Sequence, residues 1–453
     1  MQINPRARAI IDTLRSRGHQ ALLAGGCVRD MLLDREPHDW DIATSAAPAQ
    51  IAEIFPRSLA VGAAFGVMTV VAGAGENREQ FEVATFRRDG EYRDGRHPDR
   101  VEFSSPRADA TRRDFTINAL FYDPSAAEII DYVGGQNDLA KKIIRAVGEP
   151  EKRFQEDRLR LLRAVRFAAR LDFAIEENTA AAIKKTPLTG ISAERVAAEL
   201  NQIFTGDGAG RGLQMLADFG LLAATLPEVE ALRGVEQPPE FHPEGDVFAH
   251  TKLMLDRFSA TPPDEALLAL TKDERRMLAW AVVLHDVGKP ATQTFDGRWR
   301  FNRHDEAGAT LAAEILHRLK MPARMSAAVR DLVARHMHFV DLRKWREAKR
   351  RRFLQDPLFP AHLALHYLDC AGSHGMLAGY EYAAAALSAE RARPPSPPPL
   401  LTGADLIALG YPPGALFKEI LTAAQDAALE GELTSKEEAR AWVRAKWKNK
   451  VEF

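Results

Sequence analysis

The spacing of the apolar residues changes near residue 140, and this change constrains the fold more than any other feature of the sequence. Before it, Gly, Pro and Asn/Asp turn signals separate short β-like runs, which read ALLAGG, WDIATS, GVMTVVAG, QFEVATF, RVEF and ALFYD. After it, EDRLRLLRAVRFAARLDF carries a helical stripe of Leu161, Leu162, Val165, Ala168 and Ala169. We therefore predict an α+β protein, with a small mixed β-sheet at the N-terminus followed by an all-α remainder.

The 453 residues are enough for two to four domains. GVEQPPEFHPEGD (234–246) has the composition of a linker, and RPPSPPPL (393–400) that of a stiff proline linker. Together with the Gly-Gly break at 134–135, they divide the chain into four predicted regions: 1–140, 141–235, 236–390 and 391–453.

The composition limits the class of protein. A formal net charge of −2 does not by itself indicate a nucleic-acid partner, although a local basic face remains compatible with one. Two distant cysteines make a disulfide framework improbable. The segment MQINPRARAIIDTLRSRG lacks the apolar region of a signal peptide, and the sequence has no apolar run of bilayer-spanning length. We expect a protein of the reducing cytoplasm with no membrane partner.

Two aspartates, Asp39 and Asp41, follow a glycine pair (Gly25 and Gly26) and Arg29. If DWDIA is a strand, both carboxylates point to the same face, and they repel unless a cation lies between them. Mg²⁺ binds a few carboxylates together with phosphate oxygens, and glycines let the backbone approach a phosphate. On this reading, Thr44 and Ser45 are further phosphate donors and Arg29 is a phosphate or carboxylate partner. The alternative is a pair of turn or helix-capping acids.

A third acid stands in QFEVATF. Phe81, Val83 and Thr85 share one face of this predicted strand, and Glu82 lies on the other with Ala84. Because an acid within an apolar strand needs a partner, Glu82 is either a third acid beside the metal or a structural acid.

The segment AGGCVRDMLLDREPHDWDIATS resembles the signature of nucleotidyltransferases that build RNA 3′ ends. The resemblance is to the bacterial class (class II) of tRNA CCA-adding enzymes and their poly(A) polymerase relatives. The matching positions are Gly25, Gly26, Val28, Arg29, Asp30, Leu32, Leu33, Asp39, Asp41 and Thr44. Further motifs of this family follow in order: VGAAFGVMTV (61–70), FEVATFR (81–87), YRDGRHPDRVEF (92–103), RRDFTINALFYD (112–123), DYVGGQNDL (131–139), EDRLRLLRAVRF (156–167) and SAERVAAEL (192–200).

The resemblance implies a reaction in which an RNA 3′-hydroxyl attacks the α-phosphate of a nucleoside triphosphate and releases pyrophosphate. Asp39 and Asp41 would hold two Mg²⁺ ions, with Glu82 as a possible third acid. Asp157 and Arg160, read as i, i+3 neighbours on a helix, would recognise the edge of the base. The other residues implied to bind nucleotide, at the sugar or triphosphate, are Gly25, Gly26, Arg29, Arg112, Arg113, Asp114, Asn118, Arg163 and Arg166.

The family resemblance also bears on which nucleotides are added. In this family a flexible loop, here RRDGEYRDGRHPD (87–99), is tied to the switch from C to A addition, and enzymes that add only CC have it shortened. The chain keeps this loop, and the segment after the two aspartates, SLAVGAAFGVM (58–68), lacks the Arg-Arg-Phe run that poly(A) polymerases carry there. We therefore expect full CCA addition to tRNA from CTP and ATP. A poly(A) polymerase, or a CC-only or A-only enzyme, is the alternative.

The histidines of the helical half resemble the HD superfamily of metal-dependent phosphohydrolases. The pattern H…HD…D maps to His250, His285 with Asp286, and Asp369. Such a donor set suits Ni²⁺, Mn²⁺, Co²⁺ or Fe²⁺ better than Mg²⁺. His304 and His336 would add a second metal or hold phosphate, and Lys289 would bind phosphate.

The resemblance implies hydrolysis of 2′,3′-cyclic phosphates and 2′-nucleotides, with general phosphatase activity. A non-catalytic RNA-binding body is the alternative. RKWREAKRRRF (343–353) is either a solvated helix face or a tRNA backbone contact.

Overall fold

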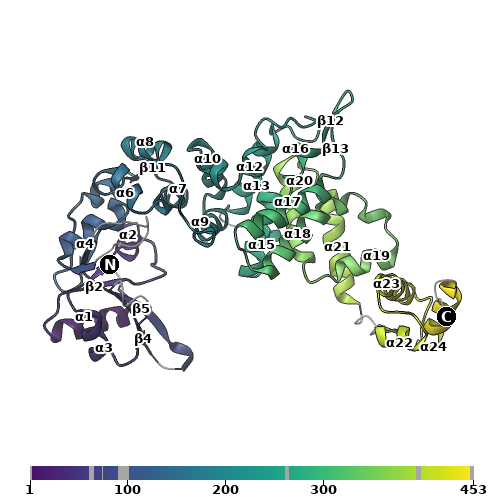
Figure 1. The fold of residues 1–453 in the computed structure, drawn as a ribbon, viewed down its shortest axis with the longest axis horizontal. Helices are drawn as coiled ribbons and strands as arrows, with labels where there is room; N and C mark the ends of the chain where they lie inside the picture. The colour runs from purple at the N-terminus through teal and green to yellow at the C-terminus, as the bar shows by residue number, and fades with distance from the viewer. Residues whose placement is uncertain are drawn as a thin grey trace. The chain divides into compact units, whose positions relative to one another are not determined.

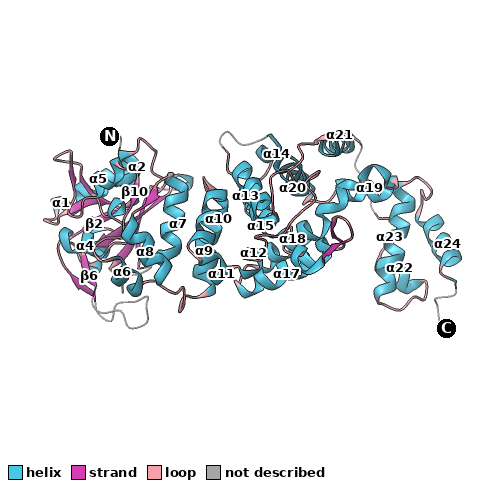
Figure 2. Cartoon of the chain, turned by 90° about the horizontal axis from the view of Figure 1, so that it is seen from above, coloured by secondary structure: helices cyan, strands magenta, loops and turns pink. Residues whose placement is uncertain are grey.

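The computed structural model describes residues 3–60, 66–73, 75–89, 101–260, 265–393 and 399–448. The chain divides into two compact units (Figure 1). Unit 1 comprises Met1–Glu230 with Arg318–Met321, and unit 2 comprises Ala231–His317 with Pro322–Phe453. Figure 2 shows the strands gathered mainly in the first unit and helices making up most of the second. The predicted α+β class is confirmed, and the four predicted domain boundaries stay predictions.

Unit 1 is built on a seven-stranded mixed sheet in the order β3-β4-β5-β2-β1-β8-β9. The β2–β5 pair is parallel, with Ile42 opposite Val83, and the other pairs are antiparallel. Short connections account for the antiparallel pairs β3–β4, β4–β5 and β8–β9, whereas the pairs β1–β2 and β1–β8 join strands that helices separate in the sequence. The strands are β1 (Ala21–Ala24), β2 (Ile42–Thr44), β3 (Ser58–Leu59), β4 (Val67–Ala72), β5 (Glu79–Thr85), β8 (Phe121–Asp123) and β9 (Glu128–Ile130), and smaller sheets contain β6 (Arg87–Asp89), β7 (Val101–Phe103), β10 (Ile143–Ile144) and β11 (Ala174–Ile175).

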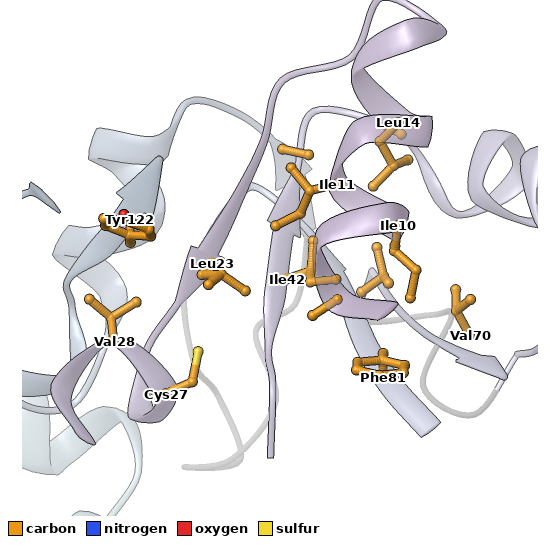
Figure 3. Packing of buried hydrophobic residues seen from close by; sticks show 14 of the residues in the cluster. Ile10, Ile11, Leu14, Leu23, Cys27, Val28, Ile42, Val70, Phe81 and Tyr122 are labelled. Atoms are coloured by element: carbon orange, nitrogen blue, oxygen red, sulfur yellow. The ribbon is translucent and has the colours of Figure 1, made fainter. Parts of the chain in front are cut away.

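Alternation along the central strands buries both faces of this sheet. Leu23 and Ile42 point to one face, where they pack with Ile10, Ile11 and Leu14 of helix α1 (Pro5–Ser16) (Figure 3). Leu22, Ala24 and Ala43 point to the other face, where they pack with Phe86, Phe121 and Val147. A sheet covered on both faces holds the loops at its strand ends in a fixed position, and the first candidate site is built there.

Helices complete unit 1. They are α2 (Gly26–Leu32), α3 (Pro48–Ile54), α4 (Pro106–Arg112), α5 (Gly135–Ala140), α6 (Pro150–Glu156), α7 (Leu159–Leu171), α8 (Glu177–Lys185), α9 (Ala193–Thr205), α10 (Ala209–Asp218), α11 (Leu221–Thr225) and α12 (Pro227–Glu230), with 3-10 turns η2 (Gly75–Asn77) and η3 (Thr116–Asn118). The predicted stripe of α7 is confirmed, because each of its five residues is at most 4% exposed. Ser192 stands at the N-cap of α9, as predicted.

Unit 2 is almost entirely helical in its described part. It contains α13 (Val247–Phe258), α14 (Glu265–Leu268), α15 (Lys272–Leu284), α16 (Lys289–Thr292), α17 (His304–Arg318, whose last residue is assigned to unit 1), α18 (Ala323–Arg335), α19 (Glu347–Leu354), α20 (Phe359–Gly372), α21 (Ala378–Ala392), α22 (Gly403–Ala408), α23 (Ala415–Leu429) and α24 (Lys436–Lys446), with 3-10 turns η4 (His336–Val340) and η5 (Leu342–Lys344). A hairpin joins β12 (Gln293–Phe295) to β13 (Trp299–Phe301). Seven consecutive residues of α15, Leu278–Leu284, are fully buried, so this helix forms the centre of the unit.

Several sequence predictions fall partly outside the described residues, including the motifs at 61–70 and 92–103. The loop at 87–99 is described only up to residue 89, and the proline linker at 393–400 lacks description for 394–398. The segment at 234–246 is described throughout. It is an integral part of unit 2 rather than a free linker, because Gln237 is buried there.

Both cysteines are free and buried. Burial raises the pKa of each thiol to about 12, which leaves the unreactive thiol form at neutral pH. Within the described residues, no helix has both the length and the apolar character needed to cross a membrane.

Candidate functional sites

A sharp turn between β1 and α2 opens the first site. Gly25 has a φ of +76°, and a Cβ there would lie 2.8 Å from Nη1 of Arg113. Only glycine satisfies both the backbone angle and the close contact. Gly26 then begins α2, so the first turn of this helix lies next to the guanidinium group of Arg113.

The two aspartates lie just before β2, which begins at Ile42, so the prediction that DWDIA forms a strand is wrong for Asp39 and Asp41 themselves. The backbone oxygen of Asp41 nevertheless accepts a hydrogen bond of 3.0 Å from Ala24, which extends the β1–β2 ladder. This bond preserves the alternation: Trp40 and Ile42 pack on the apolar core, and Asp41 lines a cavity with Asp39.

Glu82 lies close to Asp41 from the neighbouring strand. The parallel register pairs Ile42 with Val83, and one step back it brings Asp41 beside Glu82. Burial and the nearby charge of Glu82 raise the pKa of Asp41 to about 6. The charge of Asp39 also raises this pKa, whereas that of Arg113 lowers it. Crowded carboxylates of this kind favour a bound cation. Glu82 itself is exposed, so the argument that burial forces it to have a partner is wrong.

Thr44 and Ser45 are occupied by the fold. The Thr44 hydroxyl is fully buried and donates to the backbone oxygen of Gln20 at 2.7 Å. Ser45 Oγ accepts from the backbone nitrogen of Gln20 at 2.9 Å. Their predicted role as phosphate donors is therefore wrong for Thr44, and Ser45 serves the same structural junction.

An arginine-rich wall and the two aspartates line the same cavity of about 650 Å³. Eight arginines and five aspartates line it, so the wall carries net positive charge and suits a triphosphate. The lining includes every predicted nucleotide-binding residue: Gly25, Gly26, Arg29, Arg112, Arg113, Asp114, Asn118, Asp157, Arg160, Arg163 and Arg166.

Asp109, which the sequence analysis missed, fixes two of these arginines. Its carboxylate is 1% exposed and accepts from Arg112 at 2.6 Å and from Arg113 at 3.0 Å. Although burial raises the pKa of Asp109, the two guanidinium groups bring it below its usual value. The signal was present in the sequence, since Asp109 lies i, i+3 and i, i+4 from its partners on α4.

A chain of polar contacts joins the wall to α7. Arg29 donates to Asn118 at 2.7 Å, Asn118 donates to Asp114 at 3.3 Å, and Arg163 donates to Asp114 at 2.6 Å. Although burial raises the pKa of Asp114, Arg163 and Arg160 lower it to about 2, so it is charged at neutral pH. Arg166 pairs with Glu199 of α9 at 2.8 Å, and its guanidinium lies 4.4 Å from the centre of the Phe167 ring.

Asp157 and Arg160 both line the cavity, but the predicted helix-face pair between them is wrong. Asp157 stands in the break between α6 and α7, where Oδ1 accepts from the backbone of Leu159 at 3.1 Å and Oδ2 from Arg195 at 2.7 Å. Arg160 instead pairs with Glu156 at 2.7 Å. Asp157 leaves the helix because its carboxylate satisfies an N-terminal amide. Arg195, on α9, was missed.

The second site gathers the predicted HD residues inside unit 2. His250 lies 3.1 Å from Asp369 (Nε2 to Oδ1), and His285 lies 3.1 Å from Asp286 (Nε2 to Oδ2). The His250 and His285 rings are 5.5 Å apart, centre to centre. Although burial lowers the pKa of His250, Asp369 and Glu244 raise it to about 9. The four HD residues thus come from α13, from the turn directly after α15, and from α20.

Three histidines present their Nε2 atoms to this centre. The Nδ1 atoms of His285, His304 and His336 donate to the backbone oxygens of Val282, Phe301 and Val333 at 2.7–2.9 Å. A carbonyl can only accept, so Nδ1 carries a proton in each ring, and in the neutral ring Nε2 is the nitrogen that can bind a metal. The Nε2 atoms of His304 and His336 lie only 3.1 Å apart, and burial lowers the pKa of His336 to about 4. A metal ion satisfies these facing lone pairs better than a proton.

Asp286 connects the two halves of the centre. Its Oδ1 lies 3.4 Å from His304 and 4.0 Å from His336, and its Oδ2 lies 2.7 Å from Nζ of Lys289. Although burial raises the pKa of Asp286, His285 and Lys289 hold it well below its usual value. Among the groups of donors close enough to hold a cation are His250–His285–Asp286 and Asp286–His304–His336. The mixed N and O donors fit a transition metal.

The segment read as a linker supplies residues that the sequence analysis missed. Glu244 accepts from Nδ1 of His250 at 2.7 Å and from His242 at 3.0 Å, and Gln237 accepts from Lys289 at 2.6 Å. A carboxylate on Nδ1 orients a histidine so that Nε2 faces a metal. The proline-rich composition concealed this role, because it resembles that of a solvent-exposed connection.

Some of the basic residues of segment 343–353 form ion pairs within the protein. Arg351 contacts Glu390 at 3.0 Å and Arg352 contacts Asp426 at 2.7 Å. Lys349 lies 3.8 Å from the centre of the Trp345 ring. Arg351 and Arg352 therefore hold α19 against α21 and α23. The prediction of a fully solvated helix face is wrong for these two residues.

Three family models match the chain. The Poly A polymerase head domain matches residues 21–145, the probable RNA and SrmB-binding site of polymerase A matches 172–232, and the HD domain matches 249–359. Their order agrees with the sheet, the following helices and the histidine cluster described above. Fold and sites together define a nucleotidyltransferase of the poly(A) polymerase head type that also carries an HD domain.

The similar proteins narrow this class. A CCA-adding enzyme of Geobacillus stearothermophilus is 39% identical over 312 residues, which cover 68% of this chain and 69% of that protein. The chain belongs to the family of CCA-adding enzymes. A relative of the same name from Oceanobacillus iheyensis is 43% identical over 219 residues, and the chain spans only about half (54%) of its length.

The solved structure of the Bacillus stearothermophilus CCA-adding enzyme in complex with CTP is similar over 99% of both chains. Its TM-score is 0.72 at 28% sequence identity. The fold described here is thus the fold of that enzyme along the whole length of both chains.

Proposed function

We propose that the chain adds CCA to the 3′ end of tRNA without a template, using CTP and ATP and releasing pyrophosphate. One observation carries this proposal: in a chain of the CCA-adding family, Asp39 and Asp41 share a single cavity with eight arginines. Two carboxylates in a cavity whose lining carries net positive charge suit a metal-bound triphosphate.

Asp39 and Asp41 would hold the Mg²⁺ ions, and Glu82 is the candidate third acid. Bound Mg²⁺ activates the RNA 3′-hydroxyl and neutralises the pyrophosphate leaving group. The chain's own cations orient the triphosphate, with Arg113 nearest the turn at Gly25. Asp114 and Asn118 would contact the ribose.

The base would be read by Asp157 and Arg160. Cytosine and adenine share an exocyclic amine next to a ring nitrogen acceptor, and guanine and uracil present the opposite arrangement. An acceptor (Asp157) beside a guanidinium donor (Arg160) therefore fits C and A by the same contacts. Both residues line the cavity: Asp157 stands in the break before α7, and Arg160 lies in the first turn of α7.

The test is end-sequencing of a tRNA lacking CCA after incubation with CTP, ATP or both. We expect CC with CTP alone, and CCA with both nucleotides. A run of A residues from ATP alone would identify a poly(A) polymerase, and a product that stops at CC in the presence of both nucleotides would identify a CC-only enzyme.

For the second site we propose a metal-dependent phosphohydrolase acting on 2′,3′-cyclic phosphates and 2′-nucleotides. The proposal is supported by the three Nε2 atoms that converge on Asp286. Ni²⁺, Mn²⁺, Co²⁺ or Fe²⁺ would be held by His250, His285, Asp286 and Asp369, with His304 and His336 completing a second position. Bound metal activates water for attack on phosphorus, and Lys289 would hold a phosphate oxygen.

The test measures ring opening of RNA ending in a 2′,3′-cyclic phosphate, and release of phosphate from RNA ending in a 2′-phosphate, with each metal in turn and with a chelator. Activity that returns with a transition metal and is lost in Asp286→Ala supports the proposal. Inactivity of the unmodified chain with every metal would favour a non-catalytic body.

A further inference from the structure

The cavity above the histidine cluster is lined by exposed apolar side chains. Phe241, Met337, Val340 and Met376 are 48%, 40%, 67% and 57% exposed, and all four line the same cavity of about 610 Å³ as Asp286. Exposed apolar groups that gather at one site mark a binding surface, whereas isolated ones need no explanation. These four come from three separate segments of the chain, so their meeting is a product of the fold.

The same cavity contains cationic groups. Lys289, Arg298 and Arg300 line it, and Lys289 is held in place by Asp286 at 2.7 Å and Gln237 at 2.6 Å. Trp299 and Phe301 of β13 add aromatic surface. A cavity that combines a candidate metal centre, cationic side chains and an apolar mouth is complementary to a ligand with a phosphate at one end and a flat apolar ring at the other.

A small phosphate ester would use the metal centre and the cations only. It would leave the four apolar side chains in water, where they gain nothing from binding. A nucleobase would cover them, because every base offers a π-face that stacks on aromatic and thioether groups without regard to its hydrogen-bonding edge.

We propose that Phe241, with Met337, Val340 and Met376, forms a nucleobase platform that makes the second site selective for nucleoside phosphates over base-free phosphates. This inference rests on the proposed phosphohydrolase and adds the part of the substrate that the metal centre does not touch. The platform accepts all four bases, because stacking does not read the Watson–Crick edge.

The test uses two pairs of ligands that differ by the base. Binding of adenosine 2′-phosphate and glycerol 2-phosphate to the full chain is measured by titration calorimetry without added metal, so that neither ester is hydrolysed during the titration. Hydrolysis is measured on adenosine 2′,3′-cyclic phosphate and glycerol 1,2-cyclic phosphate. Phe241→Ala and Met376→Ala are compared with Leu268→Ala, which removes a 65% exposed side chain of the same unit outside this cavity.

We expect Phe241→Ala to weaken binding of adenosine 2′-phosphate about tenfold, the range of one base stacking contact. The same variant should raise KM for the cyclic adenosine ester and leave kcat and both glycerol ligands within twofold. Phe241→Tyr should restore binding, and Leu268→Ala should change nothing. Guanosine, cytidine and uridine 2′-phosphates should bind within about fivefold of the adenosine compound.

The two proposals fail in different ways. Equal binding of adenosine and glycerol phosphates, equal effects of Phe241→Ala on both, or binding of neither would overturn the platform. Hydrolysis of both cyclic esters with equal KM would overturn the platform and leave the phosphohydrolase standing. Base-dependent binding that Phe241→Ala abolishes, without hydrolysis by the unmodified chain, would support the platform and refute the phosphohydrolase.

Discussion

The negative charge of Asp41 lowers the stability of the folded protein. Burial and the charges of Glu82 and Asp39 raise its pKa to about 6 from 3.8, and Arg113 offsets only part of this. The folded chain therefore holds a proton on Asp41 between roughly pH 4 and 6 that the unfolded chain has released. By linkage, stability falls as pH rises through this window, and the cost is fully present at pH 7.

Asp41→Asn should accordingly stabilise the metal-free protein at pH 7 by about 1–2 kcal/mol, allowing for solvent screening, and abolish nucleotide addition. The gain should vanish at pH 4, where the native carboxyl is protonated. Urea unfolding at both pH values checks this, with the exposed Asp207→Asn as the control. A variant less stable than the unmodified chain at pH 7 would show that Asp41 is stabilised as an anion.

Glu244 illustrates how a residue acts through another. It contacts Nδ1 of His250 at 2.7 Å and so fixes which nitrogen faces the metal centre. Glu244→Ala should lower Ni²⁺ or Co²⁺ affinity about 10- to 100-fold in a chelator-competition titration. Glu240→Ala, an exposed acid of the same segment, serves as the control. Unchanged metal affinity in Glu244→Ala would contradict the positioning role.

At the scale of the elements, the break between α6 and α7 positions the two residues that we propose recognise the base. Asp157 lies in the break and is tied to Leu159 and to Arg195 of α9. Arg160 is tied back to Glu156 on α6. The relative position of the two groups thus depends on three helices and not on the pitch of one.

Asp157→Ala should relax the choice between CTP, ATP and the other triphosphates more than it slows the reaction. Loss of the bond to Leu159 should also cost about 0.5–2 kcal/mol of stability. Asp157→Asn, which keeps an acceptor oxygen, separates the two effects. End-sequencing with single nucleotides and with mixtures measures the choice. Unchanged selectivity in both variants would refute base reading by Asp157.

At the scale of the whole molecule, the two candidate sites draw on separate compact units. The first is lined by residues 25–195 and the second by residues 238–376. Asp39→Ala with Asp41→Ala should abolish CCA addition and leave hydrolysis of cyclic phosphates intact. Asp286→Ala should have the reverse effect. Both activities measured on each variant check this, and loss of both in either one would indicate a shared structural defect.

Local pattern was sufficient for much of the fold. The β-like runs, the stripe of α7 and the N-cap at Ser192 follow from short-range spacing, and spacing within a helix or strand is a property of the sequence itself. The HD residues were likewise identifiable from their order, and the structure brings His250, His285, Asp286 and Asp369 together.

The sequence by itself determined which elements form and which residue types they carry. Only the tertiary structure decided that the Thr44 hydroxyl bonds to Gln20 and that Asp157 pairs with Arg195 rather than Arg160. It also decided that Glu244 and Gln237, in an apparent linker, bond to His250 and Lys289 of the histidine cluster. These pairings join residues that are up to 52 positions apart. A buried polar group takes the nearest partner in space, and packing of the apolar core, not spacing along the chain, sets which partner that is.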